Sequence, residues 1–290
     1  MNVDTIPADL AQLILDAKAI DQENEAITAT SIALIDHTSL SDTLGTPMMG
    51  SETPEQIRTL CKAAVGEGAH HVAAVCVYPN FIELARECLE GTDVKVAVVH
   101  NFPHGDQGIT DAVEDVKISI DNGAEEIDTV VDYAKFMQGG EIISILAAVS
   151  EVCKLSNVTL KIILKASVYT KYEHLYYIAQ LACEAGADFI KTCTGKLPKE
   201  GFGDGAADIS TLETGAVVIQ AVADYNREFG TSIGVKISGG VKTKIDCARF
   251  HYLVEQLLGE DFYHPDKFRY GASSLLHNLS NASLTNLKKY

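Results

Sequence analysis

The sequence predicts an α/β fold, a (β/α)8 barrel with an N-terminal helical extension. Three observations predict it. Short apolar runs rich in β-branched residues alternate with helical patterns from residue 31 onward. We count about eight such pairs, and they recur roughly every 30 residues over about 250 residues, which is the usual size of this barrel. The runs are apolar on both faces, as in parallel strands that helices cover.

A doubly wound sheet is the competing α/β fold. Its dinucleotide-binding version places a glycine-rich turn after the first strand, whereas here that strand runs into the polar segment DHTSLSD. No convincing linker interrupts the chain. We therefore expect one domain over residues 1–290, with 1–30 as the extension and 31–290 as the barrel.

The expected elements begin with a helix near residues 7–21, ahead of the first strand. The eight predicted strands are 31–36, 71–78, 94–100, 126–131, 159–166, 188–194, 234–238 and 270–273. Helix starts are indicated where a polar residue stands three positions before Glu or Gln, namely at Thr53, Asn80, Thr170 and Ser210. Helix ends are indicated at Gly91 and Gly186.

Composition and charge exclude several classes of protein. The 290 residues are 47% hydrophobic and 22% charged, which excludes wholesale disorder. No apolar run of about 18 residues indicates a transmembrane helix, and the start lacks the pattern of a signal peptide. The net charge of −17 disfavours binding to nucleic acid or to anionic membranes. The seven scattered cysteines form no CxxC pair, so we expect a reducing, cytoplasmic setting and no zinc site.

Charged residues inside apolar strands are the feature that indicates a function. Lys and Asp are seldom buried unless they are paired. A single strand lysine usually forms a helix-facing salt bridge or reaches solvent, but five charges on five strands of one barrel can meet in its interior. Lysines held there lower one another's pKa, and a neutral lysine is a nucleophile toward aldehydes and ketones. The five residues are Asp36, Asp128, Lys161, Lys191 and Lys236.

The segments after the last two strands are typical of a phosphate site. Barrels often bind phosphate in the loops after strands seven and eight, at the start of a helix. Here SGGVKT and YGASSLL follow those strands, although Gly-Gly can simply make a turn and Ser can simply cap a helix. The predicted phosphate-binding residues, including two that follow the sixth strand, are Gly195, Lys196, Gly239, Gly240, Lys242, Gly271, Ser273 and Ser274.

Six segments in this order resemble the deoxyribose-phosphate aldolase family from about residue 31 to the C-terminus. They are VCVYPNF (75–81), NFPHG (101–105), EEIDTVV (125–131), DFIKTCTGK (188–196), GVKISGGVKT (234–243) and FRYGASSLL (268–276). The resemblance implies a class I aldolase with no metal or organic cofactor. It implies reversible cleavage of 2-deoxy-D-ribose 5-phosphate to glyceraldehyde 3-phosphate and acetaldehyde, usually in deoxyribonucleotide catabolism and carbohydrate degradation.

The resemblance also implies roles for single residues. Lys191 matches the Schiff-base lysine and Lys236 the second catalytic lysine, while Asp128 and Lys161 match the family's residues on the fourth and fifth strands. The terminal Tyr290 matches a tyrosine that can fold over the site, although a frayed tail is the equal alternative. From their chemistry, we expect Lys236 to lower the pKa of Lys191 and Asp128 to move protons.

Several features depart from the family pattern, among them Cys193 in place of a frequent Ser and Lys242 in place of a frequent Arg. Lys165 stands where many relatives have an acidic residue, so it either changes the range of substrates or faces solvent. The loop 197–208 is longer than in compact relatives. The histidines His70, His71, His100 and His104 lack convergent spacing, so no metal site is expected.

Two other functions remain open from the sequence. One is another lysine-dependent aldolase acting on a different sugar phosphate, and the other is a non-catalytic phosphate-binding barrel. We expect small molecules as partners, namely a phosphorylated sugar and acetaldehyde, and a homodimer as the assembly.

Overall fold

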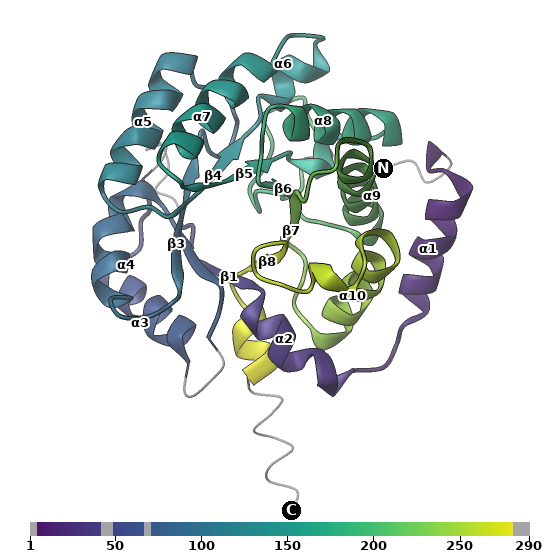
Figure 1. The fold of residues 1–290 in the computed structure, drawn as a ribbon, viewed down its shortest axis with the longest axis horizontal. Coiled ribbons are helices and arrows are strands. Elements are labelled where there is room, and N and C mark those ends of the chain that lie inside the picture. Colours follow the sequence, from purple (N-terminus) through teal and green to yellow (C-terminus); the bar gives the residue numbers. More distant parts are fainter. Residues whose placement is uncertain (1–4, 42–48, 67–70, 281–290) are drawn as a thin grey trace, which may run out of the picture.

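Eight parallel strands close into a barrel in their chain order, β1 to β8, in the computed structural model of the chain (Figure 1). The structure describes residues 5–41, 49–66 and 71–280. The closed ring of eight parallel strands confirms the predicted barrel. The strands are β1 (Ile35–Thr38), β2 (Ala74–Val77), β3 (Lys95–His100), β4 (Glu126–Val130), β5 (Thr159–Ile163), β6 (Phe189–Lys191), β7 (Gly234–Ser238) and β8 (Phe268–Ala272).

Helices form the outer layer, and the chain between successive strands passes through at least one of them (Figure 1). They are α3 (Pro54–Val65), α4 (Ile82–Cys88), α5 (Ile109–Asp121), α6 (Tyr133–Met137), α7 (Ile143–Leu155), α8 (Tyr172–Glu184), α9 (Leu212–Phe229) and α10 (Lys244–Leu258). Since every strand is parallel to its neighbours, their carboxyl ends and the loops that follow them share one end of the barrel. Side chains near these ends can therefore build one site.

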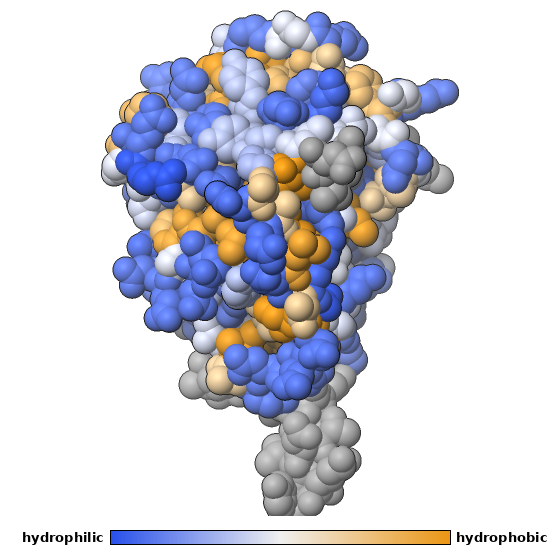
Figure 2. Space-filling model, turned by 90° about the vertical axis from the view of Figure 1, so that its right-hand side faces the viewer, coloured by the Kyte–Doolittle hydropathy of each residue, from blue (hydrophilic) through white to orange (hydrophobic). Residues whose placement is uncertain are grey.

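The N-terminal extension is helical, as predicted. It contains α1 (Ala8–Ala19) and α2 (Thr28–Ala33). Helix α1 packs on the outside of the barrel against α9 and α10, where it buries Leu10, Ile14 and Ala17 (Figure 1). The face on this side of the molecule carries polar and charged side chains around its apolar ones (Figure 2). Burial of one apolar stripe explains why a solvent-exposed helix docks there.

The boundaries of several strands differ from the prediction. The first predicted strand, 31–36, overlaps α2, and β1 begins only at Ile35. The run SIALI is short and apolar, and periodicity alone does not separate a buried helical turn from a strand in such a run. The last strand begins at Phe268 rather than at residue 270, and it includes the charged residue Arg269, whose partners Asp36 and Glu126 are buried.

One of the four predicted helix starts is confirmed. Thr53 caps α3 in a capping box with Gln56. The other three are wrong, since Phe81, Lys171 and Thr211 stand at the caps of α4, α8 and α9. The Ser210 hydroxyl instead donates to the backbone oxygen of Ser238, 2.7 Å away, so it joins two loops at the mouth of the barrel. At Ser210, a competing tertiary hydrogen bond is the reason that the local spacing misled.

None of the helices within the described residues combines the length and the apolarity needed to cross a membrane.

Candidate active site

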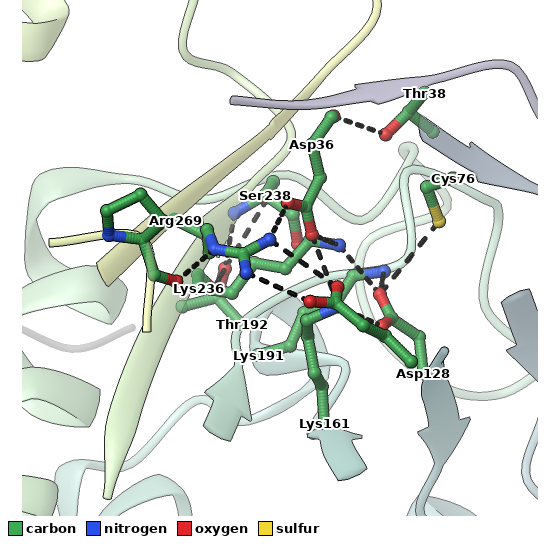
Figure 3. A network of polar contacts seen from close by, with 12 residues as sticks. Asp36, Thr38, Cys76, Asp128, Lys161, Lys191, Thr192, Lys236, Ser238 and Arg269 are labelled. Atoms are coloured by element: carbon green, nitrogen blue, oxygen red, sulfur yellow. Dashed lines mark hydrogen bonds and ion pairs between the residues drawn. The ribbon is translucent and has the colours of Figure 1, made fainter. Parts of the chain in front are cut away.

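The Asp128 carboxylate is the centre of the polar cluster inside the barrel (Figure 3). Lys191 Nζ and Lys236 Nζ both donate to Oδ2 of Asp128, each over 2.7 Å. Lys161 Nζ donates to the other oxygen, Oδ1, over 2.9 Å. Asp128, Lys161 and Lys236 are fully buried, and Lys191 is 4% exposed. The four charged residues predicted from the strands as catalytic therefore meet at one point.

The register of the strands explains why these four side chains come together. Lys191 is paired with Lys236 across β6 and β7, and Asp128 is paired with Lys161 across β4 and β5. Residues paired in this way on parallel strands point to the same face. Lys191 is the last residue of β6, so its amine lies nearest the open end of the barrel.

The electrostatic environment gives the two amines that share Oδ2 different pKa values. Burial lowers the pKa of Lys191, and the Lys236 ammonium lowers it further, against the opposing effect of Asp128. Burial alone would lower the pKa of Lys236 too, but the carboxylates of Asp128 and Asp36 raise it above its usual value. The arrangement thus favours a neutral Lys191 beside a charged Lys236.

The carboxylate is held in its ionised form by the same neighbours. Burial by itself would raise the pKa of Asp128, but the three lysine cations keep it well below the usual range. The thiol of Cys76 lies 3.9 Å from Oδ2, and burial raises the pKa of that thiol. Cys76 is therefore a neutral neighbour of the site.

Three further charged residues belong to the cluster. Lys236 Nζ lies 2.5 Å from Oδ2 of Asp36, and Arg269 binds Asp36 over 2.5 Å and Glu126 over 2.9 Å. Sequence reasoning noted Asp36 as a strand charge without giving it a role, and it missed the other two. Glu126 opens a predicted strand and Arg269 adjoins one, so the same search for charges in strands, extended by one residue, finds both.

A cavity of about 140 Å³ opens beside Lys191 at the carboxyl ends of the strands. All the predicted phosphate-binding residues except Lys196 line this cavity. Lys242, Ser273 and Ser274 are exposed there. The amine of Lys196 donates instead to the backbone oxygen of Leu40.

Several backbone amides around this cavity already have acceptors. The amide of Gly239 donates to Gly271 over 3.3 Å, and that of Gly195 donates to Asp208 over 2.9 Å. At the start of α10, the amides of Lys242 and Thr243 both donate to the Asp246 carboxylate. The exposed hydroxyls and the Lys242 amine are thus better placed to meet an anion than these amides.

Gly271 is required for a steric reason. A Cβ at this position would lie 2.8 Å from Ser238 Cβ and 3.0 Å from Cε of Lys236. Glycine therefore leaves the room through which the Lys236 side chain reaches Asp128.

Lys165 is buried, so the expectation that it faces solvent is wrong. It stands in the left-handed region, with φ of 59°, two residues after the end of β5. Its amine donates to Thr194 Oγ1 over 2.9 Å and to the backbone oxygen of Lys196 over 3.1 Å. Lys165 thus ties the end of β5 to the start of the loop that follows β6.

That loop reaches past the end of β5 to the segment that follows β4. The amide of Lys199 donates to the Tyr133 hydroxyl over 2.8 Å, and the Phe202 ring meets the Tyr133 ring edge to face, with centroids 5.5 Å apart. Tyr133 also contacts His104 Nδ1 over 3.3 Å. The long loop is therefore an ordered wall of the mouth. Tyr290 lies outside the described residues, as does His70.

Comparisons with known proteins agree with this site. The sequence matches the profile of the DeoC/LacD family of aldolases over residues 30–254. A provisionally assigned deoxyribose-phosphate aldolase from Coccidioides immitis is similar in structure, with a TM-score of 0.71, 27% identity and 98% of each chain covered. One from Toxoplasma gondii, also provisionally assigned, has a TM-score of 0.75 at 24% identity, with 90% of this chain and 96% of that chain covered.

The fold also matches that of deoxyribose phosphate aldolase from Aeropyrum pernix, whose structure is described as tetrameric. The TM-score is 0.64 at 22% identity, with 96% of this chain and 99% of that chain covered. The profile spans β1 to β7 and includes every lysine and carboxylate of the cluster, whereas Arg269 on β8 lies beyond its end. The chain belongs to the DeoC/LacD family of aldolases, and it is a carbon–carbon lyase.

Proposed function

We propose that the protein is a Schiff-base aldolase that reversibly cleaves 2-deoxy-D-ribose 5-phosphate to glyceraldehyde 3-phosphate and acetaldehyde. One observation carries the proposal: the Lys191 and Lys236 amines lie 2.7 Å from the same oxygen of Asp128 inside the barrel. Burial and the adjacent cation favour the neutral form of Lys191, which is the form that attacks a carbonyl.

The reaction starts when the Lys191 amine adds to the aldehyde carbon of the open-chain sugar. The hydroxyl group of the carbinolamine then takes up a proton and leaves as water, which gives an iminium. When the C2–C3 bond breaks, its electron pair moves toward the iminium and the C3 hydroxyl gives up its proton. Glyceraldehyde 3-phosphate leaves, and an enamine of acetaldehyde stays on Lys191. Protonation of the enamine carbon and hydrolysis release acetaldehyde and restore the amine.

Asp128 is suited to carry the protons of these steps because it contacts both amines. Lys236 supports the reaction as a fixed cation beside Lys191, and Lys161 holds the second oxygen of Asp128 in place. The cavity beside Lys191 supports a substrate whose phosphate lies against Lys242, Ser273 and Ser274. An anchored phosphate would hold the reacting carbon over the amine.

Trapping of the covalent intermediate tests the proposal. The protein is incubated with acetaldehyde, reduced with borohydride, digested and analysed by mass spectrometry. We expect an ethyl group on Lys191, and loss of that adduct and of activity in Lys191→Leu. Lys62→Leu, a change of an exposed lysine on α3, is the matched control and keeps both. An adduct on another lysine, with Lys191 unmodified, would overturn the assignment.

The substrate is tested separately by release of acetaldehyde from 2-deoxyribose 5-phosphate, 2-deoxyribose and other pentose and hexose phosphates. We expect the first to react fastest, and removal of its phosphate to reduce kcat/KM. If a different sugar phosphate is cleaved faster, the proposed substrate is wrong, whereas the proposed Schiff-base chemistry is unaffected.

A further inference from the structure

The buried cluster holds an unequal number of opposite charges. Within the described residues, its ion pairs join four cationic side chains to three carboxylates. The cations are Lys161, Lys191, Lys236 and Arg269, and the carboxylates are Asp36, Glu126 and Asp128. If all of them are ionised, one positive charge is in excess. If one amine is neutral, the cluster is balanced, and an excess buried charge is costly.

Arg269 and Glu126 form the end of the cluster that is farther from the reacting amine. Glu126 is the first residue of β4 and Arg269 the second of β8, whereas Lys191 is the last of β6. Arg269 donates to both oxygens of Glu126 and to Asp36. Glu126 in turn pairs with Lys161. The pair therefore reaches Lys191 through Asp36, Lys161 and the other members of the cluster.

Arg269 is also held in place by groups outside the cluster. The guanidinium of Arg269 lies 5.6 Å from the centre of the Phe189 ring and donates to the backbone oxygen of Pro265. Arg269 and Glu126 are each 3% exposed. Solvent therefore screens their charges only weakly, and each charge interacts electrostatically with the other charged groups inside the barrel.

The thiols of Cys76 and Cys193 and the ring of His100 add no charge to the cluster. Burial raises the pKa of the Cys76 and Cys193 thiols above the usual value. Burial lowers the pKa of His100 to about 4, and its ring is hydrogen-bonded to Ser119 on α5. The titratable groups of the strands that belong to the cluster or contact it are Asp36 on β1, Cys76 on β2, Glu126 and Asp128 on β4, Lys161 on β5, Lys236 on β7 and Arg269 on β8, whereas the His100 ring on β3 is turned toward α5.

We propose that Arg269 and Glu126 are positioning residues that set the charge balance of this cluster, so that the Lys191 amine is neutral when it meets the carbonyl. The proposal rests on the Schiff-base function proposed above. Arg269 supplies the third fixed cation and Glu126 the third carboxylate. Losing the cation leaves a negative cluster that attracts a proton to Lys191. Losing the carboxylate leaves a positive cluster that repels it.

The test measures the pH dependence of borohydride trapping of acetaldehyde on Lys191, together with that of kcat/KM. We compare the wild-type protein with Arg269→Met, Glu126→Gln and the double variant. We expect the acid limb of both profiles to move to higher pH in Arg269→Met and to lower pH in Glu126→Gln. Each shift should be about one pH unit, and the double variant should return toward the wild type.

Two controls keep the test decisive if a variant fails to fold. Arg269→Lys retains the cation and should leave the acid limb in place, even if the poorer geometry reduces kcat. Glu125→Gln removes the carboxylate next to Glu126 in sequence. That carboxylate is partly exposed and pairs with Arg86 and Lys95 outside the cluster, so this variant should not move the limb.

Each outcome has one meaning. A merely structural role lowers activity in both single variants and more so in the double variant, without opposite shifts, and this result would overturn the inference. If the wild-type protein is trapped on Lys191 but the acid limbs of all variants coincide with that of the wild type, the role of Arg269 and Glu126 is overturned. The Schiff-base function then stands. Failure of the wild-type protein to be trapped on Lys191 would refute the proposed function itself.

Discussion

At Asp128, one carboxylate oxygen accepts from two lysines with different electrostatic surroundings. Among the residues that the structure describes, the Lys191 amine has this one carboxylate within ion-pair distance, whereas the Lys236 amine also contacts Asp36. A second carboxylate stabilises the ammonium form, so Lys236 retains its proton more strongly than Lys191. The difference between a nucleophile and a fixed cation therefore comes from one extra neighbour.

Asp128→Asn tests the role of this carboxylate. The amide keeps the size of the side chain but loses its charge and its ability to accept a proton. We expect kcat to fall by about 10²–10⁴-fold, the usual contribution of a general acid–base group. Steady-state cleavage of 2-deoxyribose 5-phosphate measures it, with Asp93→Asn, an exposed change, as control. Unchanged kcat in Asp128→Asn would exclude the carboxylate from proton transfer.

At the scale of elements, β7 and β8 must approach closely for Lys236 to reach Asp128. Gly271→Ala tests this requirement. The added Cβ would lie 3.0 Å from Lys236 Cε and should displace that side chain. We expect a loss of kcat with a smaller change of KM for acetaldehyde. Gly108→Ala is the control because its nearest neighbour, an Asp111 oxygen, would be 3.8 Å away. Equal activity of the two variants would count against the steric argument.

The loop after β6 depends on a brace from β5. The Lys165 amine donates to Thr194 and to the backbone oxygen of Lys196, so Lys165→Met should release the start of the loop. We expect faster amide hydrogen exchange over residues 194–208 and easier proteolysis there, with exchange in β1 to β4 unchanged. Lys171→Met, an exposed change just before α8, is the control. Identical exchange in both variants would show that the loop is held by other contacts.

At the scale of the whole molecule, the buried cluster makes the free energy of unfolding depend on pH at both the acidic and the basic end of the range. Burial would raise the pKa of Asp36, but Lys161, Lys236 and Arg269 lower it below its usual value. Its contribution is therefore full above the unfolded carboxylate pKa of about 4 and is lost as the pH falls below that value. The pKa of Lys236 is raised, so its contribution is full below about 10.4, the usual lysine value, and is lost as the pH rises above it.

Asp36→Asn tests this linkage. The change leaves buried cations with fewer partners, and breaking a buried ion pair costs about 3–5 kcal/mol. We expect the urea midpoint at pH 7 to fall, and the dependence of unfolding free energy on pH below about 4 to become weaker. Urea unfolding followed by circular dichroism at several pH values measures both. An unchanged midpoint would mean that solvent or a shifted proton replaces the lost carboxylate.

The sequence by itself determined the barrel and the four charged residues at its centre. Apolar runs at a regular spacing require burial on both faces, and a charge within such a run needs a partner, so Lys161, Lys191, Lys236 and Asp128 were recognisable locally. The shared Asp128 oxygen, the role of Arg269 and Glu126 and the burial of Lys165 were decided by the tertiary structure. Each depends on strand register and on side chains from distant parts of the chain, and local periodicity contains no information about such distances.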